Sequence, residues 1–259
     1  MAEPYLPPEM VAPRPAAPTR TNPKLEPNPF SDDDGSLPQQ LREAKAVEPP
    51  HRTPAVVQAL VTSRVLVPVL AHTHPGRTDD GGVVGHGAHA TGEEDACETS
   101  TTPRVELPDG RHAFPVFTSW DAMRRWDATA RPVPAFGVSA ARTAISSGEN
   151  LILVDPDDDP VLLPRPAVWA LATEEEWVPA WRNPEVERAV VRALVGIEPI
   201  AAARVEVGHT TEIRVVVLIR RGLDALTMRD ALTAASQQLG QDPVLREKVD
   251  TIELYPMAE

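Results

Sequence analysis

The sequence predicts an α+β fold: two small mixed-sheet domains with helices, the second an α-β-β-α-β unit, behind a disordered Pro-rich N-terminal tail. Short apolar segments broken by prolines run from about Arg64 to Pro166, and their length and β-branched content are typical of strands. After Asn183, an amphipathic helical pattern precedes two segments of strand character. The predicted boundaries are a tail at 1–27, an N-terminal domain at 28–172, a connector at 173–183 and a C-terminal domain at 184–259.

Composition and charge restrict the possible classes of protein. Of the 29 prolines, 13 fall within residues 1–54, and the Pro/Ala-rich tail cannot bury enough apolar surface to offset its ordering entropy. The formal net charge of −13 repels phosphate backbones, which argues against nucleic acid as a partner. Cys97 is the single cysteine, so a reducing compartment fits. Without a visible secretory signal or an apolar run approaching about 20 residues, we expect a cytoplasmic protein with no membrane partner.

The predicted elements of the N-terminal domain follow in chain order. A weak helix contains Leu41 and Ala44, and a second begins at Thr53 as N-cap with proline at the next position. The strand Arg64–Leu70 is apolar on both faces and is therefore predicted to be central. A long loop occupies 72–100. The remaining elements are a hairpin turning at Pro108–Gly110, helices at Ser119–Trp126 and Ser139–Ser147, strands at Arg131–Gly137, Leu151–Val154 and Val161–Leu163, and a helix at Pro166–Ala172.

The C-terminal domain has clearer signals. Asn183 caps a helix with Pro184 in its first position. Thr227–Asp230 resembles a capping box for a later helix. The other predicted elements are strands at Ala203–Val207, Thr211–Arg220 and Thr251–Tyr255, and a short helix from Asp242-Pro243.

One strand of this domain suggests a contact surface. In Thr211–Arg220, the side chains of Arg214, Val216, Leu218 and Arg220 share the face opposite Ile213, Val215, Val217 and Ile219. If helices cover only the second face, the first is a partly apolar surface of the kind that binds a protein partner or a second copy. The alternative is that the N-terminal domain covers it.

Several residue clusters contain groups that could bind a metal or take part in catalysis. His72, His74, His86 and His89, with Cys97, contain metal-binding groups, but they lie in a Gly-rich segment with no visible scaffold, so a solvated loop is favoured. Asp155–Asp159 lacks the frame of a calcium loop and is predicted to be a plain turn. Ser139 departs from the G-x-S-x-G motif, and an N-cap role is favoured. Trp120, Trp126 and Trp169 are expected in packing roles. We therefore predict no catalytic, cofactor or metal residues.

Taken together, several strings of this chain resemble the SseB family, named for enhanced serine sensitivity, and most closely its actinobacterial type. The strings are NPFSDDDGS (28–36), PAVVQALVTSRVLVPVLA (54–71), LPDGRHAFPVFTSWDAM (107–123), RPVPAFGVSAARTAI (131–145), LILVDP (151–156) and VLLPRPAVWALA (161–172). The segment 183–255 is similar to the C-terminal domain of that family. The resemblance implies a fold and carries no catalytic residue across, and the His-rich loop at 72–89 departs from it.

The functional prediction is a non-catalytic SseB-like protein that serves as a protein-interaction module. A first alternative is a small-molecule sensor linked to serine or other amino-acid metabolism, which only the family name suggests. A second is an enzyme of unrecognised class, which is disfavoured because the sequence offers no paired nucleophile and base, metal frame or phosphate loop.

Overall fold

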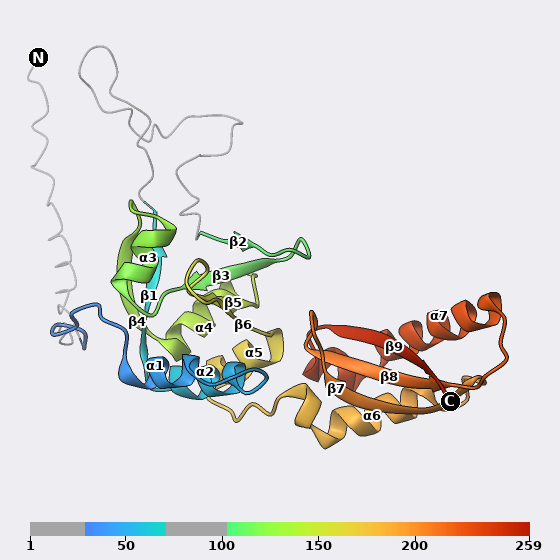
Figure 1. The fold of residues 1–259 in the computed structure, drawn as a ribbon. Coiled ribbons are helices and arrows are strands. Elements are labelled where there is room, and N and C mark those ends of the chain that lie inside the picture. Colours follow the sequence, from blue (N-terminus) through green and yellow to red (C-terminus); the bar gives the residue numbers. More distant parts are fainter. Residues whose placement is uncertain (1–28, 71–102) are drawn as a thin grey trace, which may run out of the picture. The chain divides into compact units, whose positions relative to one another are not determined.

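A computed structural model describes residues 29–70 and 103–259 (Figure 1). The predicted tail at 1–27 and the loop at 72–100 lie outside the described residues. Asp34–Glu259 is one unit by its internal contacts, and it holds all the helices and strands of the described residues. No helix in the two described ranges is both long and apolar enough to cross a membrane.

The described N-terminal residues form two small sheets with helices, in agreement with the predicted α+β class. In chain order the elements are α1 (Gln39–Lys45), α2 (Arg52–Leu60), β1 (Arg64–Val69), β2 (Val105–Glu106), β3 (His112–Val116), α3 (Trp120–Trp126), β4 (Arg131–Phe136), α4 (Gly137–Ser146), β5 (Ile152–Val154), β6 (Val161–Leu163) and α5 (Arg165–Thr173). β1 pairs antiparallel with β4, and the second sheet has the order β2-β3-β5-β6 with β3 and β5 parallel. An isolated bridge between Leu66 and Phe117 joins the two sheets.

One hydrophobic core connects α1, α2, α4 and α5 to the strands. Leu41 of α1, Val56 of α2, Ala144 of α4 and Val168 of α5 are fully buried and pack in one cluster with Phe114 of β3. The helical spacing of apolar residues in the sequence therefore marks the buried faces correctly. This core holds the turns at the strand ends in fixed positions.

β1 forms a ladder only with β4, in a two-stranded sheet, so the central position predicted for it is limited to one isolated bridge on its other side. The harmless placement predicted for its proline is confirmed. Leu66 exchanges two backbone hydrogen bonds with Phe117, at 2.8 and 2.9 Å, so its N–H and C=O point away from β4. Because backbone groups alternate in direction along a strand, Pro68 points to the same side. Its missing N–H therefore costs no bond in the ladder with β4.

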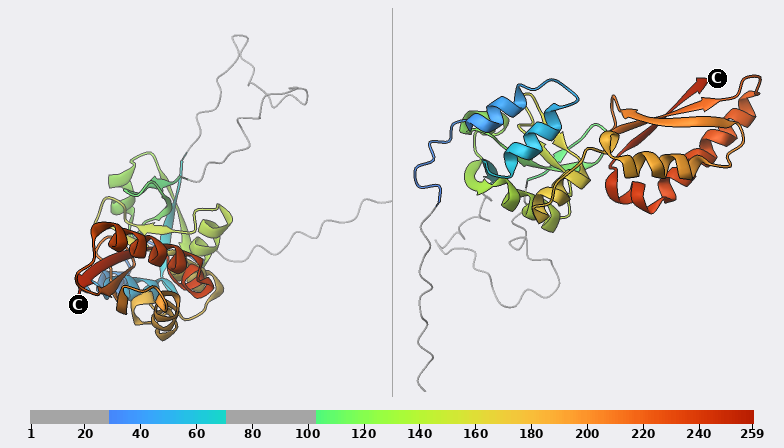
Figure 2. Two further views of the ribbon diagram at one scale, coloured as in Figure 1. Left: turned by 90° about the vertical axis from the view of Figure 1, so that its right-hand side faces the viewer. Right: turned by 90° about the horizontal axis from the view of Figure 1, so that it is seen from below.

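The C-terminal residues form the predicted α-β-β-α-β order, with a short additional helix before the last strand. The elements are a 3₁₀ turn (Ala180–Arg182), α6 (Pro184–Leu194), β7 (Ile200–Val207), β8 (Ile213–Ile219), α7 (Ala225–Gln241), α8 (Pro243–Lys248) and β9 (Ile252–Ala258). The sheet has the order β7-β8-β9, antiparallel between β7 and β8 and parallel between β8 and β9. The helices lie on one face of this sheet and close a second core (Figures 1 and 2).

Two predicted helix starts are wrong. Thr53 does not cap α2, because the helix begins one residue earlier and His51 accepts the first helical bond, from the N–H of Ala55 at 3.1 Å. The capping box at Thr227–Asp230 is also not formed. Asp224 is the N-cap of α7, and its carboxylate accepts from the N–H of Thr227 at 2.8 Å. The N-cap of α7 thus lies three residues before the predicted one, and its short acidic side chain accepts a hydrogen bond from a free N–H of the first helical turn.

The predicted N-cap role of Ser139 is wrong as well. α4 begins two residues earlier, after Phe136, and no side chain caps it. The cause is a close approach at Gly137: a Cβ atom there would lie 2.3 Å from the carbonyl oxygen of Leu60. Glycine lets the start of α4 contact the end of α2, and its N–H donates to the carbonyl of Ser63 at 3.1 Å.

Candidate functional site

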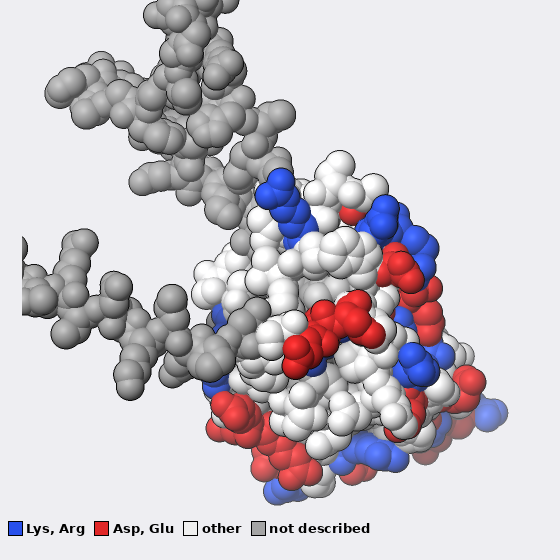
Figure 3. All heavy atoms as spheres, turned by 90° about the vertical axis from the view of Figure 1, so that its left-hand side faces the viewer, with Lys and Arg blue, Asp and Glu red and all other residues white. Residues whose placement is uncertain are grey.

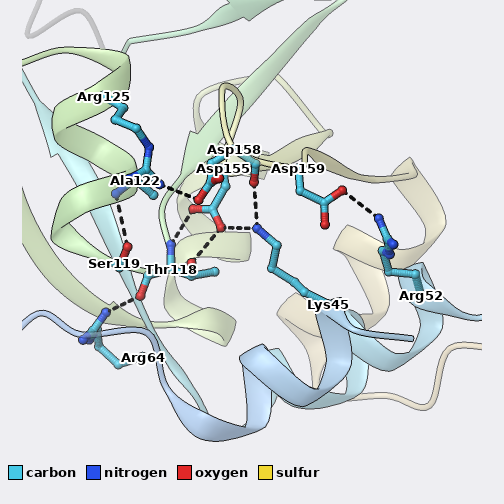
Figure 4. A network of polar contacts seen from close by, with 10 residues as sticks. All are labelled: Lys45, Arg52, Arg64, Thr118, Ser119, Ala122, Arg125, Asp155, Asp158 and Asp159. Atoms are coloured by element: carbon cyan, nitrogen blue, oxygen red, sulfur yellow. Dashed lines mark hydrogen bonds and ion pairs between the residues drawn. The ribbon is translucent and has the colours of Figure 1, made fainter. Parts of the chain in front are cut away.

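Asp155, directly after β5, is the most buried charged residue among those described, with 1% of its surface exposed. Its carboxylate accepts hydrogen bonds from the N–H of Thr118 at 2.8 Å, the hydroxyl of Thr118 at 2.7 Å and the ammonium of Lys45 at 2.6 Å (Figure 4). The turn predicted at Asp155–Asp159 is present. The buried role of its first carboxylate was not predicted, although an aspartate immediately after an apolar strand is the signal that could have indicated it.

Further ion pairs surround this carboxylate. The Lys45 ammonium also donates to the carbonyl of Asp158 at 2.9 Å, and the side chain of Asp158 pairs with Arg125 of α3. Asp159 pairs with Arg52 of α2 at 2.8 Å (Figure 4). The acidic turn is thereby tied to α1, α2 and α3 at once.

Arg64 extends the network on the other side of Thr118. Its guanidinium donates to the carbonyl of Thr118 at 2.9 Å (Figure 4). It also donates to the carbonyl of Ser36 at 2.8 Å. The strand β1 and the segment before α1 are therefore linked to the turn between β3 and α3. Hydrogen-bonded, charge-compensated groups of this kind stabilise a particular arrangement of elements.

A second buried carboxylate lies between β7 and β8. Glu212 accepts a hydrogen bond from the N–H of Asp250 at 2.6 Å through Oε2, while its buried Oε1 has no hydrogen-bond partner among the described residues. Burial raises the pKa of Glu212 to about 7, and the N–H of Asp250 only partly offsets this. The sequence contains no signal for this perturbed carboxyl group.

The candidate contact surface is the face of the β7-β8-β9 sheet opposite the helices, which we call the open face. Its cross-strand rows are Ala202–Leu218–Met257, Arg204–Val216–Tyr255 and Glu206–Arg214–Glu253. Ile213, Val215, Val217 and Ile219 point to the other side and are at most 2% exposed. The predicted division of β8 into two faces is thus confirmed for these seven positions, whereas Arg220 lies beyond β8 and pairs with Glu198.

The open face is apolar at one end and charged at the other. At the apolar end, Tyr255 is 47% and Met257 39% exposed, so no described residue covers them fully. At the charged end, Arg214 pairs with Glu253 at 2.7 Å and lies 4.7 Å from the ring of Tyr255. The hydrogen bond from Arg214 lowers the pKa of Glu253. These contacts hold the exposed aromatic ring in a defined position.

Large apolar side chains of β1, β4 and α3 in the N-terminal part are also partly exposed. Val69, Trp120, Val133 and Phe136 are each 43–46% exposed. Figure 3 shows one face of the molecule, with a broad area free of charged side chains around one acidic cluster.

The tryptophans differ in their surroundings. Trp126 packs against Phe117, with ring centroids 5.2 Å apart, as expected for a packing role. Trp120 and Trp169 are 44% and 46% exposed, so neither is buried in a core. Both lie on short helices whose buried faces are formed by smaller side chains, Ala122 and Met123 in α3 and Ala167 and Val168 in α5.

The remaining predicted candidates do not form a site among the described residues. His72, His74, His86, His89 and Cys97 lie outside the described ranges. Within those ranges, no group of three or more His, Cys, Asp or Glu side chains is arranged to hold a metal ion. Ser139 lies inside α4, where its carbonyl accepts from the hydroxyl of Thr143 at 3.0 Å.

These features define an α+β protein whose described residues have a large hydrophobic core in each of the N-terminal and C-terminal parts, an ion-pair network around a buried carboxylate in the N-terminal part, and an open sheet face in the C-terminal part. Residues 37–170, more than half of the chain, match the SseB protein N-terminal domain. The chain therefore belongs to the SseB family, which confirms the resemblance found in the sequence. None of the curated proteins and none of the solved structures compared matches it. The C-terminal sheet lies outside the matched residues.

Proposed function

We propose that this SseB-family protein is a non-catalytic protein-interaction module and that its open face binds the partner. The observation that carries the proposal is the exposure of Tyr255 and Met257 beside Leu218 on a rigid sheet. Exposed apolar side chains grouped on a regular surface are typical of protein contacts, in which aromatic residues and methionine are enriched. The ion pairs at the charged end supply the polar rim of such a surface.

The buried network supports the non-catalytic part of the proposal. Each carboxylate of Asp155, Asp158 and Asp159 is engaged by a lysine or arginine. A catalytic acid or base must be within reach of a substrate proton, and these groups are directed at one another. The network thus fits a role in holding helices to turns. The compartment that we propose is the cytoplasm, which the single cysteine favours.

The test is affinity co-purification of the full chain from native cells, with wild type compared with Met257→Glu. The matched control is Leu226→Glu on α7, because Leu226 is 58% exposed and lies outside the sheet. We expect specific partners with wild type and the control, and their loss with Met257→Glu. If no partner exceeds background with wild type, or if Met257→Glu retains every partner, the proposal is wrong.

A further inference from the structure

Free sheet edges differ in this protein in whether they can accept another strand. A strand at an edge has unpaired N–H and C=O groups that can pair with a further chain. Two bonds at the ends of β9 fix its pairing with β8. The N–H of Ile213 in β8 donates to the carbonyl of Thr251, just before β9, and the N–H of Glu259, just after β9, donates to the carbonyl of Ile219 in β8. In β9, the backbone N–H and C=O groups of odd-numbered residues are therefore directed at β8, and those of even-numbered residues are directed outward. Pro256 is one of the outward residues, so this edge lacks a donor at its centre.

β4 is protected in the same way. Since Leu66 directs its backbone groups to Phe117, its partner Pro134 must direct its own groups outward. Pro132 has the same orientation, two residues earlier. The outer edge of β4 therefore lacks two successive donors, and the remaining edge strands of the N-terminal sheets, β2 and β6, have only two and three residues.

β7 is an edge strand of eight residues without a proline. The N–H of Gly208 donates to the carbonyl of Glu212. In this antiparallel pair, the backbone N–H and C=O groups of even-numbered β7 residues are therefore directed at β8. The backbone groups of Ala203, Val205 and Val207 therefore face outward. No described residue outside the sheet makes a backbone hydrogen bond to these three. Among the described residues, β7 is thus the one long edge with three successive outward donors, Ala203, Val205 and Val207, and the register shift between Ile200 and Ala202 lies outside this stretch.

The side chains of β7 fit a second copy of the same strand. If two β7 strands pair antiparallel about a two-fold axis through Val205, Ala203 lies opposite Val207 of the second copy, and about six backbone hydrogen bonds form. In the same register, Arg204 lies opposite Glu206 of the second copy, in the close pairs where side chains interact most strongly. Both residues are on the open face, where they already pair within one chain at 2.6 Å. An axis through Arg204 would instead oppose like charges.

From these observations we propose that the protein forms a homodimer through β7, which joins two three-stranded sheets into one. On the helix-covered side, Val205 meets its own copy and Val207, 36% exposed in the single chain, becomes buried. On the other side, the two open faces become continuous. The dimer does not depend on the partner proposed above, because it uses the edge of the sheet and leaves the apolar end of the open face uncovered.

The first experiment is sedimentation equilibrium of the full chain from about 1 to 100 μM, the range in which moderate dimers dissociate. We expect a reversible dimer for wild type. Val205→Pro removes an outward N–H, as the native prolines do in β4 and β9, and is expected to weaken dimerisation at least tenfold. Val205→Thr keeps both the N–H and the branched side chain and serves as control. Circular dichroism checks that each variant is folded.

The second experiment tests the register by charge exchange and avoids any backbone change. Glu206→Arg and Arg204→Glu each place like charges opposite one another, so each alone is expected to dimerise several-fold more weakly. An equimolar mixture of the two restores opposite charges in both pairs and should give heterodimers. Glu187→Arg on α6 is the control for net charge. A monomeric wild type, or a dimer that both single variants retain unchanged, would overturn the proposal. Absence of heterodimers would overturn the register.

Discussion

Replacement of Asp155 by asparagine isolates the electrostatic contribution of the buried network. Asn has nearly the same shape, and its carbonyl can still accept from Thr118. The backbone at Asp155 has a φ of 49°, in the left-handed region, where Asn and Asp are tolerated better than most residues. The substitution therefore removes the charge without adding backbone strain. The Lys45 ammonium, on a side chain that is 12% exposed, loses its charged partner.

The expected cost follows from this loss. Removal of one member of a buried ion pair costs about 3–5 kcal/mol, because the remaining charge stays desolvated. Lys45 keeps its hydrogen bond to the carbonyl of Asp158. We therefore expect Asp155→Asn to lower the free energy of unfolding by about 3 kcal/mol, the low end of that range. When Lys45→Met is combined with Asp155→Asn, neither charge remains, so the double variant should lose less than the sum of the single variants.

Urea denaturation followed by circular dichroism measures these free energies of unfolding. The matched control is Asp159→Asn, because Asp159 has the same left-handed backbone and also pairs with a basic helix side chain, Arg52 of α2. Its side chain is 54% exposed, so the control should cost only about 0–1 kcal/mol. Equal losses for Asp155→Asn and Asp159→Asn would refute the reasoning that burial gives the network its strength.

Three further predictions concern the fold. The pKa of Glu212 is raised to about 7, so its ionisation lowers stability as the pH rises from about 4.5 through 7. Glu212→Gln should therefore become more stable relative to wild type over that interval, by up to about 3 kcal/mol in pH-dependent denaturation, and a constant difference would contradict this. Gly137→Ala should destabilise by about 1–3 kcal/mol in urea titrations because its Cβ meets the carbonyl of Leu60, whereas Gly240→Ala, with open space around it, should not. Ser119→Ala should lower the unfolding free energy by about 1 kcal/mol, since the Ser119 hydroxyl accepts from the N–H of Ala122 at the start of α3; an unchanged melting curve would exclude this capping role.

Local patterns in the sequence were sufficient for most elements. Asn183 followed by Pro184 predicted the start of α6, and the Asn183 side chain accepts from the N–H of Glu185 at 2.9 Å. Gly110 and Gly148, predicted in a turn and at a helix end, have φ values of 80° and 84°. Such signals act over a few residues and do not require knowledge of distant neighbours. Where a helix start depended on a distant contact, as at Gly137, the prediction was wrong.

The sequence by itself determined the α+β class, the membership of the SseB family and the division of β8 into a core side and an open side, because periodicity, caps and turn residues are local properties. Only the tertiary structure brought Lys45 to Asp155, 110 positions apart, and placed Pro134 and Pro256 at outward positions of their sheets. Which strand lies at an edge, and which backbone groups remain free there, depends on pairing between segments far apart in the chain. No local pattern encodes that pairing, because it is selected by the packing of the whole core.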